Sequence, residues 1–84
     1  MPNPMNDNLI RKLVMEKLNI IRNSKEAYIV NKNKEEKIIN IELKETENYA
    51  RIIITTDNEK AYVLTPAEFL RKIIRADNKV IRGI

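Results

Sequence analysis

The sequence predicts an α+β domain: a four-stranded antiparallel meander sheet with an N-terminal and a C-terminal helix packed on one face. Three observations favour this fold class. Apolar residues first recur at three- and four-residue spacing, as in an amphipathic helix. Four short β-prone segments joined by polar turns come next, and a helix-start motif follows the last of them. Residues 1–84 have room for one hydrophobic core, so we expect a single domain with residues 1–5 as a flexible lead-in.

The first helix is expected to begin after Asn6 or Asp7. Either side chain can accept hydrogen bonds from the backbone N–H groups that a helix start leaves without partners. The apolar stripe of this helix consists of Ile10, Leu13, Val14, Leu18 and Ile21. Asn23 and Ser24 are expected to end it.

Strands are predicted over residues 26–32, 38–45, 49–56 and 61–64. The second alternates apolar and polar residues, as a half-buried strand does. The third contains three consecutive isoleucines, which favours a central position in the sheet. The polar turn between the first two strands is placed at residues 31–37. Because parallel strands need long crossover connections, the short turns favour antiparallel pairing.

Thr65, Pro66 and Glu68 form the helix-start motif at the end of the last strand. Thr65 is a favoured N-cap residue, Pro66 suits the first helical position, and Glu68 can complete a capping box. The apolar face of this second helix consists of Phe69, Leu70, Ile73 and Ile74. We expect the helix to end at residues 77–78, and residues 80–84 to form a short last strand or an extended tail.

The composition argues against an enzyme. The chain has no His and no Cys, which removes the commonest general base, the thiol nucleophile and the usual ligands of structural metal sites. Its single glycine, Gly83, cannot build a glycine-rich phosphate loop. No base is evident that would activate its single serine, Ser24. We therefore expect no catalytic residue, no metal, no cofactor and no small-molecule substrate.

Composition also indicates where such a protein works. No apolar run approaches the roughly 18 residues of a membrane-spanning helix, and the first residues lack the features of a signal peptide. We expect a cytoplasmic protein with no membrane partner. Ile, Lys and Asn have A/T-rich codons, and their abundance favours a low-GC bacterium, its phage or a plasmid as the source.

The first functional hypothesis is a small regulatory protein that binds DNA or RNA through a basic helical surface. The net charge is +4, and the positive excess lies towards the two ends of the chain, where helices are predicted. The phosphate contacts are assigned to Arg71, Lys72, Arg75, Lys79 and Arg82, assisted by Arg11 and Lys12. Such contacts give salt-dependent affinity, and tyrosines on strands can stack on bases. The alternative interpretation is a solvent-facing helix surface with half-buried tyrosines.

The second hypothesis is a protein–protein inhibitor or adaptor, for example a phage anti-defence protein that occludes a host protein. If both helices cover one face of the sheet, Ile53 faces outward beside Arg51, with Tyr49 on the same side. A host protein could cover this patch, or a second copy could cover it and form a dimer. Strand 26–32 could also pair with another chain at a sheet edge. A lone surface isoleucine needs no such explanation, and the charge excess narrowly favours nucleic acid.

Overall fold

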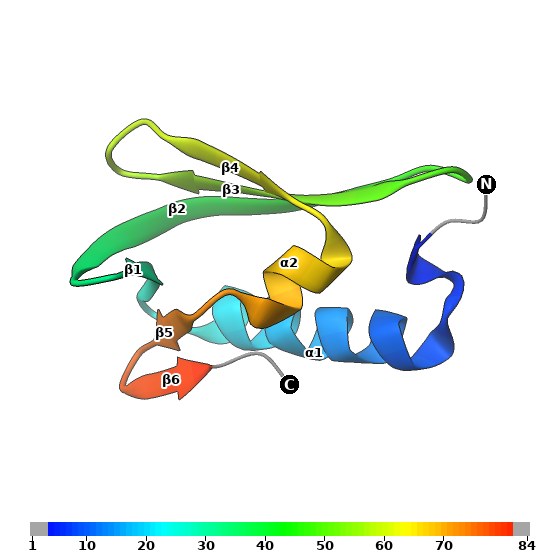
Figure 1. Cartoon of the computed structure of the whole chain (residues 1–84). Coiled ribbons are helices and arrows are strands. Elements are labelled where there is room, and N and C mark those ends of the chain that lie inside the picture. The colour runs from blue at the N-terminus through cyan, green and yellow to red at the C-terminus, as the bar shows by residue number, and fades with distance from the viewer. Residues whose placement is uncertain (1–3, 82–84) are drawn as a thin grey trace.

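The computed structural model describes residues 4–81, which form an α+β architecture with two α-helices and an antiparallel sheet (Figure 1). The chain runs through a 3-10 turn, a long helix, four strands, a short helix and a final hairpin. In chain order the elements are η1 (Pro4–Asn6), α1 (Asn8–Asn23), β1 (Ala27–Asn31), β2 (Lys34–Glu45), β3 (Ala50–Thr56), β4 (Ala61–Leu64), α2 (Pro66–Arg71), β5 (Ile74–Ala76) and β6 (Lys79–Ile81).

The start of α1 follows the predicted capping chemistry. Asp7 is the N-cap residue, and its carboxylate accepts hydrogen bonds from the N–H groups of Leu9 (2.8 Å) and Ile10 (3.3 Å). These bonds satisfy donors that have no partner inside the helix. From the predicted apolar stripe, the buried residues are Val14, Leu18 and Ile21.

The sheet has six strands within the described residues, in the order β4-β3-β2-β1-β5-β6, and each neighbouring pair is antiparallel. The predicted number of four strands is therefore wrong, although the meander from β1 to β4 is present. The predicted turn at residues 31–37 is also too long. Only Lys32 and Asn33 separate β1 from β2, and Lys32 has a φ of 53°, the left-handed conformation that tight hairpin turns favour.

The C-terminal helix is much shorter than predicted. Its start is as expected: the Thr65 hydroxyl accepts from the Glu68 N–H (3.1 Å), and the Glu68 carboxylate accepts from the Thr65 N–H (2.8 Å). The helix ends at Arg71, however, and Lys72 is already extended, with a ψ of 132°. The hairpin of β5 and β6 occupies the residues expected to continue the helix.

Two contacts far apart in sequence favour this hairpin over a longer helix. Ile74 is fully buried and stands opposite Ile29 in the β1–β5 ladder, a position that suits a β-branched side chain. Asp77 lies in the β5–β6 turn with a φ of 53° instead of ending a helix. Its carboxylate accepts hydrogen bonds from the N–H groups of Lys25 and Glu26, both at 3.1 Å. The hairpin is thereby tied to the start of β1.

The end of α2 is held by a lysine to which the sequence analysis assigns no role. Lys17 of α1 is 4% exposed. Its ammonium donates hydrogen bonds to the carbonyl oxygens of Phe69 (2.7 Å), Leu70 (3.2 Å) and Lys72 (2.5 Å). They lie at the end of α2, where the last carbonyl groups of a helix lack the usual donor four residues on. Burial lowers the pKa of Lys17 to about 8. The signal was its position, three residues after Val14 inside the apolar stripe.

The buried side chains of the helices and strands form one hydrophobic core. Phe69 of α2 and Met5 of η1 are among its largest fully buried members. Met5 belongs to the segment expected to be a flexible lead-in, and that expectation does not hold for Met5; residues 1–3 lie outside the described residues. α2 contacts α1, β3 and β4 and lies between α1 and those strands (Figure 1). Between residues 4 and 81, neither α-helix combines the length and apolar content needed to cross a membrane.

Candidate interaction surfaces

The cations assigned to nucleic-acid binding do not share one helix. Arg71 is the last residue of α2, whereas Arg75 lies in β5 and Lys79 in β6. Lys72 lies between α2 and β5, and Arg82 is outside the described residues. Arg71, Lys72 and Arg75 were expected on the basic side of the C-terminal helix, with Lys79 and Arg82 beyond its end. That helical face is not formed, because α2 ends at Arg71.

Arg75 is engaged within its own chain. Its guanidinium forms a bidentate ion pair with Glu35 of β2, with Nε–Oε2 and Nη2–Oε1 distances of 2.8 and 2.9 Å. It also donates to the carbonyl oxygen of Asp77 (2.6 Å) and lies over the ring of Tyr28, with its Cζ 4.4 Å from the ring centroid. The hydrogen bond from Arg75 lowers the pKa of Glu35. A phosphate group would have to compete with these partners.

Lys72 belongs to a polar network around the carboxylate of Glu36, which is 6% exposed. Glu36 accepts hydrogen bonds from the Tyr62 hydroxyl and from the side-chain amides of Asn58 (3.3 Å) and Asn31 (3.4 Å). The Lys72 ammonium donates to the amide oxygen of Asn31 and lies 5.6 Å from the centroid of the Tyr62 ring. The hydrogen bond between Tyr62 and Glu36 lowers the pKa of Glu36 and raises that of Tyr62.

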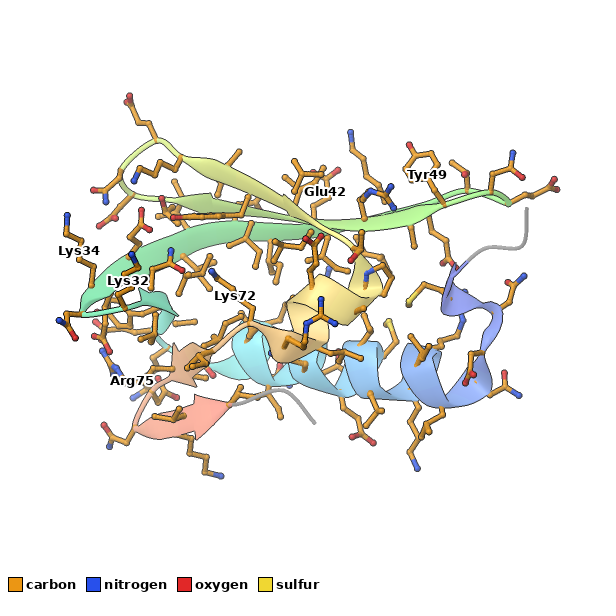
Figure 2. The ribbon with its side chains drawn as sticks, viewed as in Figure 1. Lys32, Lys34, Glu42, Tyr49, Lys72 and Arg75 are labelled. Atoms are coloured by element: carbon orange, nitrogen blue, oxygen red, sulfur yellow. The ribbon has the colours of Figure 1, made fainter. Side chains whose placement is uncertain are left out.

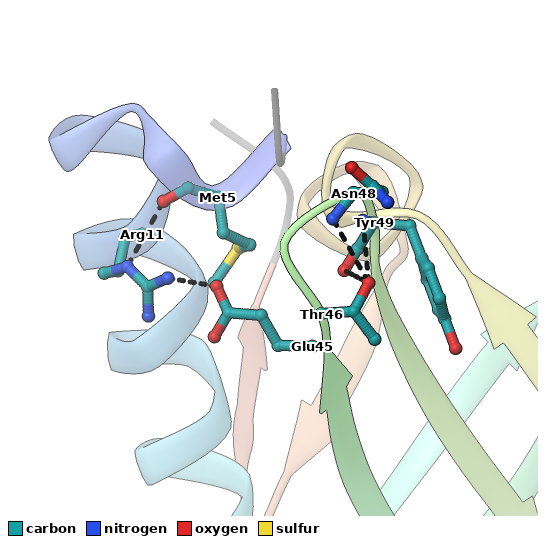
Figure 3. Close-up of polar contacts among 6 residues, drawn as sticks. All are labelled: Met5, Arg11, Glu45, Thr46, Asn48 and Tyr49. Carbon is teal, nitrogen blue, oxygen red and sulfur yellow. Dashed lines mark hydrogen bonds and ion pairs between the residues drawn. The ribbon is translucent and has the colours of Figure 1, made fainter. Parts of the chain in front are cut away.

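The two cations assigned on α1 differ in their surroundings. Arg11 donates to the carbonyl oxygen of Met5 (3.2 Å) and to the carboxylate of Glu45, at the far end of β2 (Figure 3). Lys12 is exposed. Among the assigned cations within residues 4–81, the exposed ones are Lys12, Arg71 and Lys79, which lie on α1, α2 and β6.

A second surface is formed by alternate residues of β2, β3 and β4. The buried residues of β3 are Ala50, Ile52, Ile54 and Thr56. Ile53 lies between them in sequence and is partly exposed. In the two ladders it stands opposite Glu42 of β2 and Val63 of β4, and Val63 is 59% exposed. We call the surface made by Glu42, Tyr49, Arg51, Ile53 and Val63 the outward face.

The three residues assigned to a protein interface all lie on this outward face. Tyr49 and Arg51 alternate with the buried residues in the same phase as Ile53. The guanidinium of Arg51 lies 5.4 Å from the centroid of the Tyr49 ring, and Tyr49 is 41% exposed. Figure 2 shows Tyr49 and Glu42 on the side of the sheet away from α2.

The turn that leads to Tyr49 is built by Thr46. Its hydroxyl accepts hydrogen bonds from the N–H groups of Asn48 and Tyr49, both at 3.2 Å (Figure 3). The backbone N–H of Thr46 donates to the carbonyl oxygen of Tyr49 (2.8 Å). This last bond makes Thr46 and Tyr49 a hydrogen-bonded pair across the hairpin. Because hydrogen-bonded and non-hydrogen-bonded pairs alternate along an antiparallel ladder, it fixes which pairs of β2 and β3 are hydrogen-bonded.

β2 changes neighbours along its length. Residues 34–37 pair with β1, whereas from Ile38 onward β2 pairs with β3. A β-bulge between Ile38 and Asn40 separates the two parts, and Ile39 is 61% exposed there. A hollow of about 330 Å³ lies where β1 and β2 separate, with Ile21 and Ala27 among its lining residues. Opposite β3, residues 38–44 have no strand neighbour within the described chain, and we call this side the free edge of β2.

Comparison with known proteins identifies a viral relative. The chain is 39% identical over 64 residues to "Uncharacterized protein 2" of Sulfolobus islandicus filamentous virus (isolate Iceland/Hveragerdi). The matched region covers 73% of this chain and 79% of the viral protein. No protein-family model matches the sequence, and no solved structure matches it.

Proposed function

The chain belongs to the same family as that filamentous-virus protein, and we propose that it is a non-enzymatic viral protein that binds another protein through its outward face. One observation carries this proposal. Ile53 and Val63 are cross-strand neighbours whose apolar side chains reach the surface on the same side of the sheet. The proposal takes α1 and α2 to cover the opposite side, which leaves this apolar pair for a partner.

The composition of the outward face supports a protein partner. Tyrosine and arginine are enriched at protein interfaces, and they supply most of the strongly contributing contacts. Here Tyr49 and Arg51 lie against each other beside Ile53. Glu42 and Lys44 are exposed at the β2 side of the same surface and would form a charged rim. An apolar centre with a polar rim is the usual anatomy of such an interface.

Nucleic acid is the weaker candidate because the cations on which it rested are dispersed or engaged. Arg75 binds Glu35, Arg11 binds Glu45, and Lys72 binds Asn31. Of the cations assigned to phosphate contacts, the exposed ones among the described residues are Lys12, Arg71 and Lys79, and they lie on three separate elements. Strong phosphate binding requires several cations that contact one nucleic-acid backbone. The dispersed positions of these cations do not favour such a phosphate-binding surface.

A pair of matched valine variants tests the proposal. Val63 and Val80 are strand residues that are 59% and 53% exposed, but Val80 lies on β6, away from β2–β4. The partner would be captured with this chain as bait from cells that produce the other proteins of the virus. The affinity would then be measured between the purified partner and the purified chain. Val63→Asp should weaken binding about a hundredfold, since it buries an uncompensated carboxylate. Val80→Asp should leave the affinity unchanged.

Two results would contradict this function. One is a partner that binds Val63→Asp and wild-type protein equally well. The other is a complex with DNA or RNA whose affinity falls steeply with added salt and is insensitive to Val63→Asp, which is the behaviour of phosphate recognition.

A further inference from the structure

We propose that the free edge of β2 pairs with the same edge of a second copy, antiparallel about Leu43, so that the two sheets become continuous. This inference goes beyond the proposed function, because it rests on the backbone edge of β2 with Glu42 and Lys44, whereas the proposed function rests on Ile53 and Val63. An edge strand with unpaired N–H and C=O groups is a template for a further strand, and natural proteins usually protect such edges. The bulge at Ile38 and Asn40 protects only the start of this one.

The alternation of hydrogen-bonded pairs shows which residues of β2 direct their backbone N–H and C=O groups towards the free edge. In an antiparallel pair, hydrogen-bonded and non-hydrogen-bonded positions alternate. Thr46 is hydrogen-bonded to Tyr49 across the hairpin (2.8 Å), so Lys44 and Glu42 direct their backbone N–H and C=O groups towards β3. Leu43, between them, directs its own groups towards the free edge. A second copy centred on Leu43 would exchange both hydrogen bonds with it.

The side chains that flank Leu43 make this arrangement self-complementary. Pairing about Leu43 places Glu42 of each copy opposite Lys44 of the other, at positions without backbone hydrogen bonds, where facing Cα atoms are only about 4.5 Å apart. Both side chains are exposed, and neither has an ion-pair partner in the described part of the chain. Opposite charges facing each other across strands are stabilising, and like charges are destabilising.

Neighbouring registers lack this complementarity. Shifting the centre by one residue towards the N-terminus places Glu42 opposite Glu42 of the other copy. Shifting it by one residue towards the C-terminus places Lys44 opposite Lys44. Within its own sheet Lys44 also stands opposite Arg51, and a carboxylate from a second copy would offset that repulsion. The charge pattern therefore fits a second copy in the Leu43-centred register.

Charge reversal tests the register with purified protein alone. Molar mass measured by light scattering across a concentration series should show dimers for the wild type. Glu42→Lys and Lys44→Glu should each weaken dimerisation about tenfold or more, because each places like charges together twice. An equimolar mixture of these two variants should form heterodimers, and the double variant Glu42→Lys/Lys44→Glu should recover the homodimer.

Loss of the dimer in Lys44→Glu cannot be attributed to unfolding, because the new carboxylate stands opposite Arg51 of its own chain, where opposite charges are stabilising. A wild-type protein that stays monomeric up to its solubility limit would overturn the inference. So would dimers that Lys44→Glu and Glu42→Lys leave intact. Val63→Asp, which removes the proposed function, should leave the dimer unchanged.

Crosslinking gives a second, geometric readout, because the chain has no natural cysteine. A Glu42→Cys chain mixed with a Lys44→Cys chain should form a disulfide under mild oxidation, since facing Cα atoms about 4.5 Å apart lie within the roughly 4.4–6.8 Å that a disulfide spans. Either variant alone should crosslink poorly, because the two equal positions are diagonal neighbours about 7–8 Å apart. Equal crosslinking in all three samples would contradict this register.

Discussion

Two pairs of charged residues in β2, Glu35 with Glu36 and Glu42 with Lys44, have opposite surroundings. In the first half of β2, Glu35 forms an ion pair with Arg75 of β5. Glu36 is buried and accepts a hydrogen bond from the Tyr62 hydroxyl of β4. In the second half, Glu42 and Lys44 are exposed and have no ion-pair partner among residues 4–81. From the sequence, Glu35 and Glu36 are expected in a turn and Glu42 and Lys44 in a strand, but all four belong to β2.

Sheet order explains the difference. The first half has β1 on one side, and β5 lies next to β1, so the long side chain of Arg75 can reach Glu35 across β1. The second half has β3 on one side and no strand on the other within the described residues. Glu35 and Glu36 are therefore engaged by side chains from other strands, and the number of charged residues in a segment does not reveal this.

The largest expected effect concerns the most enclosed charge, Lys17. Lys17→Met should lower the free energy of unfolding by about 2–3 kcal/mol, because the buried carbonyl oxygens at the end of α2 lose a charged donor. Urea unfolding followed by circular dichroism measures this. The matched control is Lys12→Met on the exposed side of the same helix, which should change stability by less than about 0.5 kcal/mol. Equal stability of Lys17→Met and wild type would mean that desolvation of the ammonium offsets its hydrogen bonds.

The same residue gives the wild type a characteristic alkaline behaviour. The pKa of Lys17 is lowered to about 8 in the folded chain, against about 10.4 for an unfolded lysine. Between these values the unfolded state binds more protons, so the contribution of Lys17 to stability rises with pH. This pH-dependent part of the stability is complete above the unfolded pKa of about 10.4 and is lost as pH falls through the folded pKa of about 8. In Lys17→Met this rise should be absent.

A smaller effect is expected from Tyr62→Phe, which removes the main cause of the low pKa of Glu36. A carboxyl group with a lowered folded pKa contributes stability above its ordinary pKa of about 4.3, and this is lost as pH falls through the folded value. Tyr62→Phe should therefore make the loss of stability in acid shallower than in the wild type. Thermal unfolding from neutral to acid pH measures the slope. Tyr49→Phe, on the outward face, serves as the control, and a slope altered equally by both variants would refute the assignment to Glu36.

Local chemistry explains what could be predicted from the sequence. The N-cap at Asp7, the capping box at Thr65 and the alternation in β3 depend on residues close in the chain, and all are present. Alternation also explains why Tyr49, Arg51 and Ile53 were placed on one side of β3. The first four strands were found near their true positions because β-forming residues and polar turns are also local signals.

Partners distant in sequence explain what could not be predicted. The end of α2 depends on Lys17, which is 52 residues from Phe69, and β5 depends on its pairing with β1. The ion pair of Arg75 with Glu35 spans 40 residues. No local pattern shows that a cation such as Arg75 will be held by a carboxylate of its own chain, so the sequence does not reveal which cations of a basic segment are already engaged.

The smallest expected effect has the opposite sign, and it sharpens the contrast between enclosed and exposed polar groups. Thr56 at the end of β3 is fully buried, and its hydroxyl has no hydrogen-bond partner within the described residues. Unlike Glu36, it loses hydration without gaining a bond, which is unfavourable. Thr56→Val keeps the shape and the β-branched side chain and removes the polar atom, so it should raise the free energy of unfolding by up to about 1 kcal/mol in urea titrations. A loss of stability would instead mean that the Thr56 hydroxyl has a hydrogen-bond partner in solution, as the Glu36 carboxylate has in the fold.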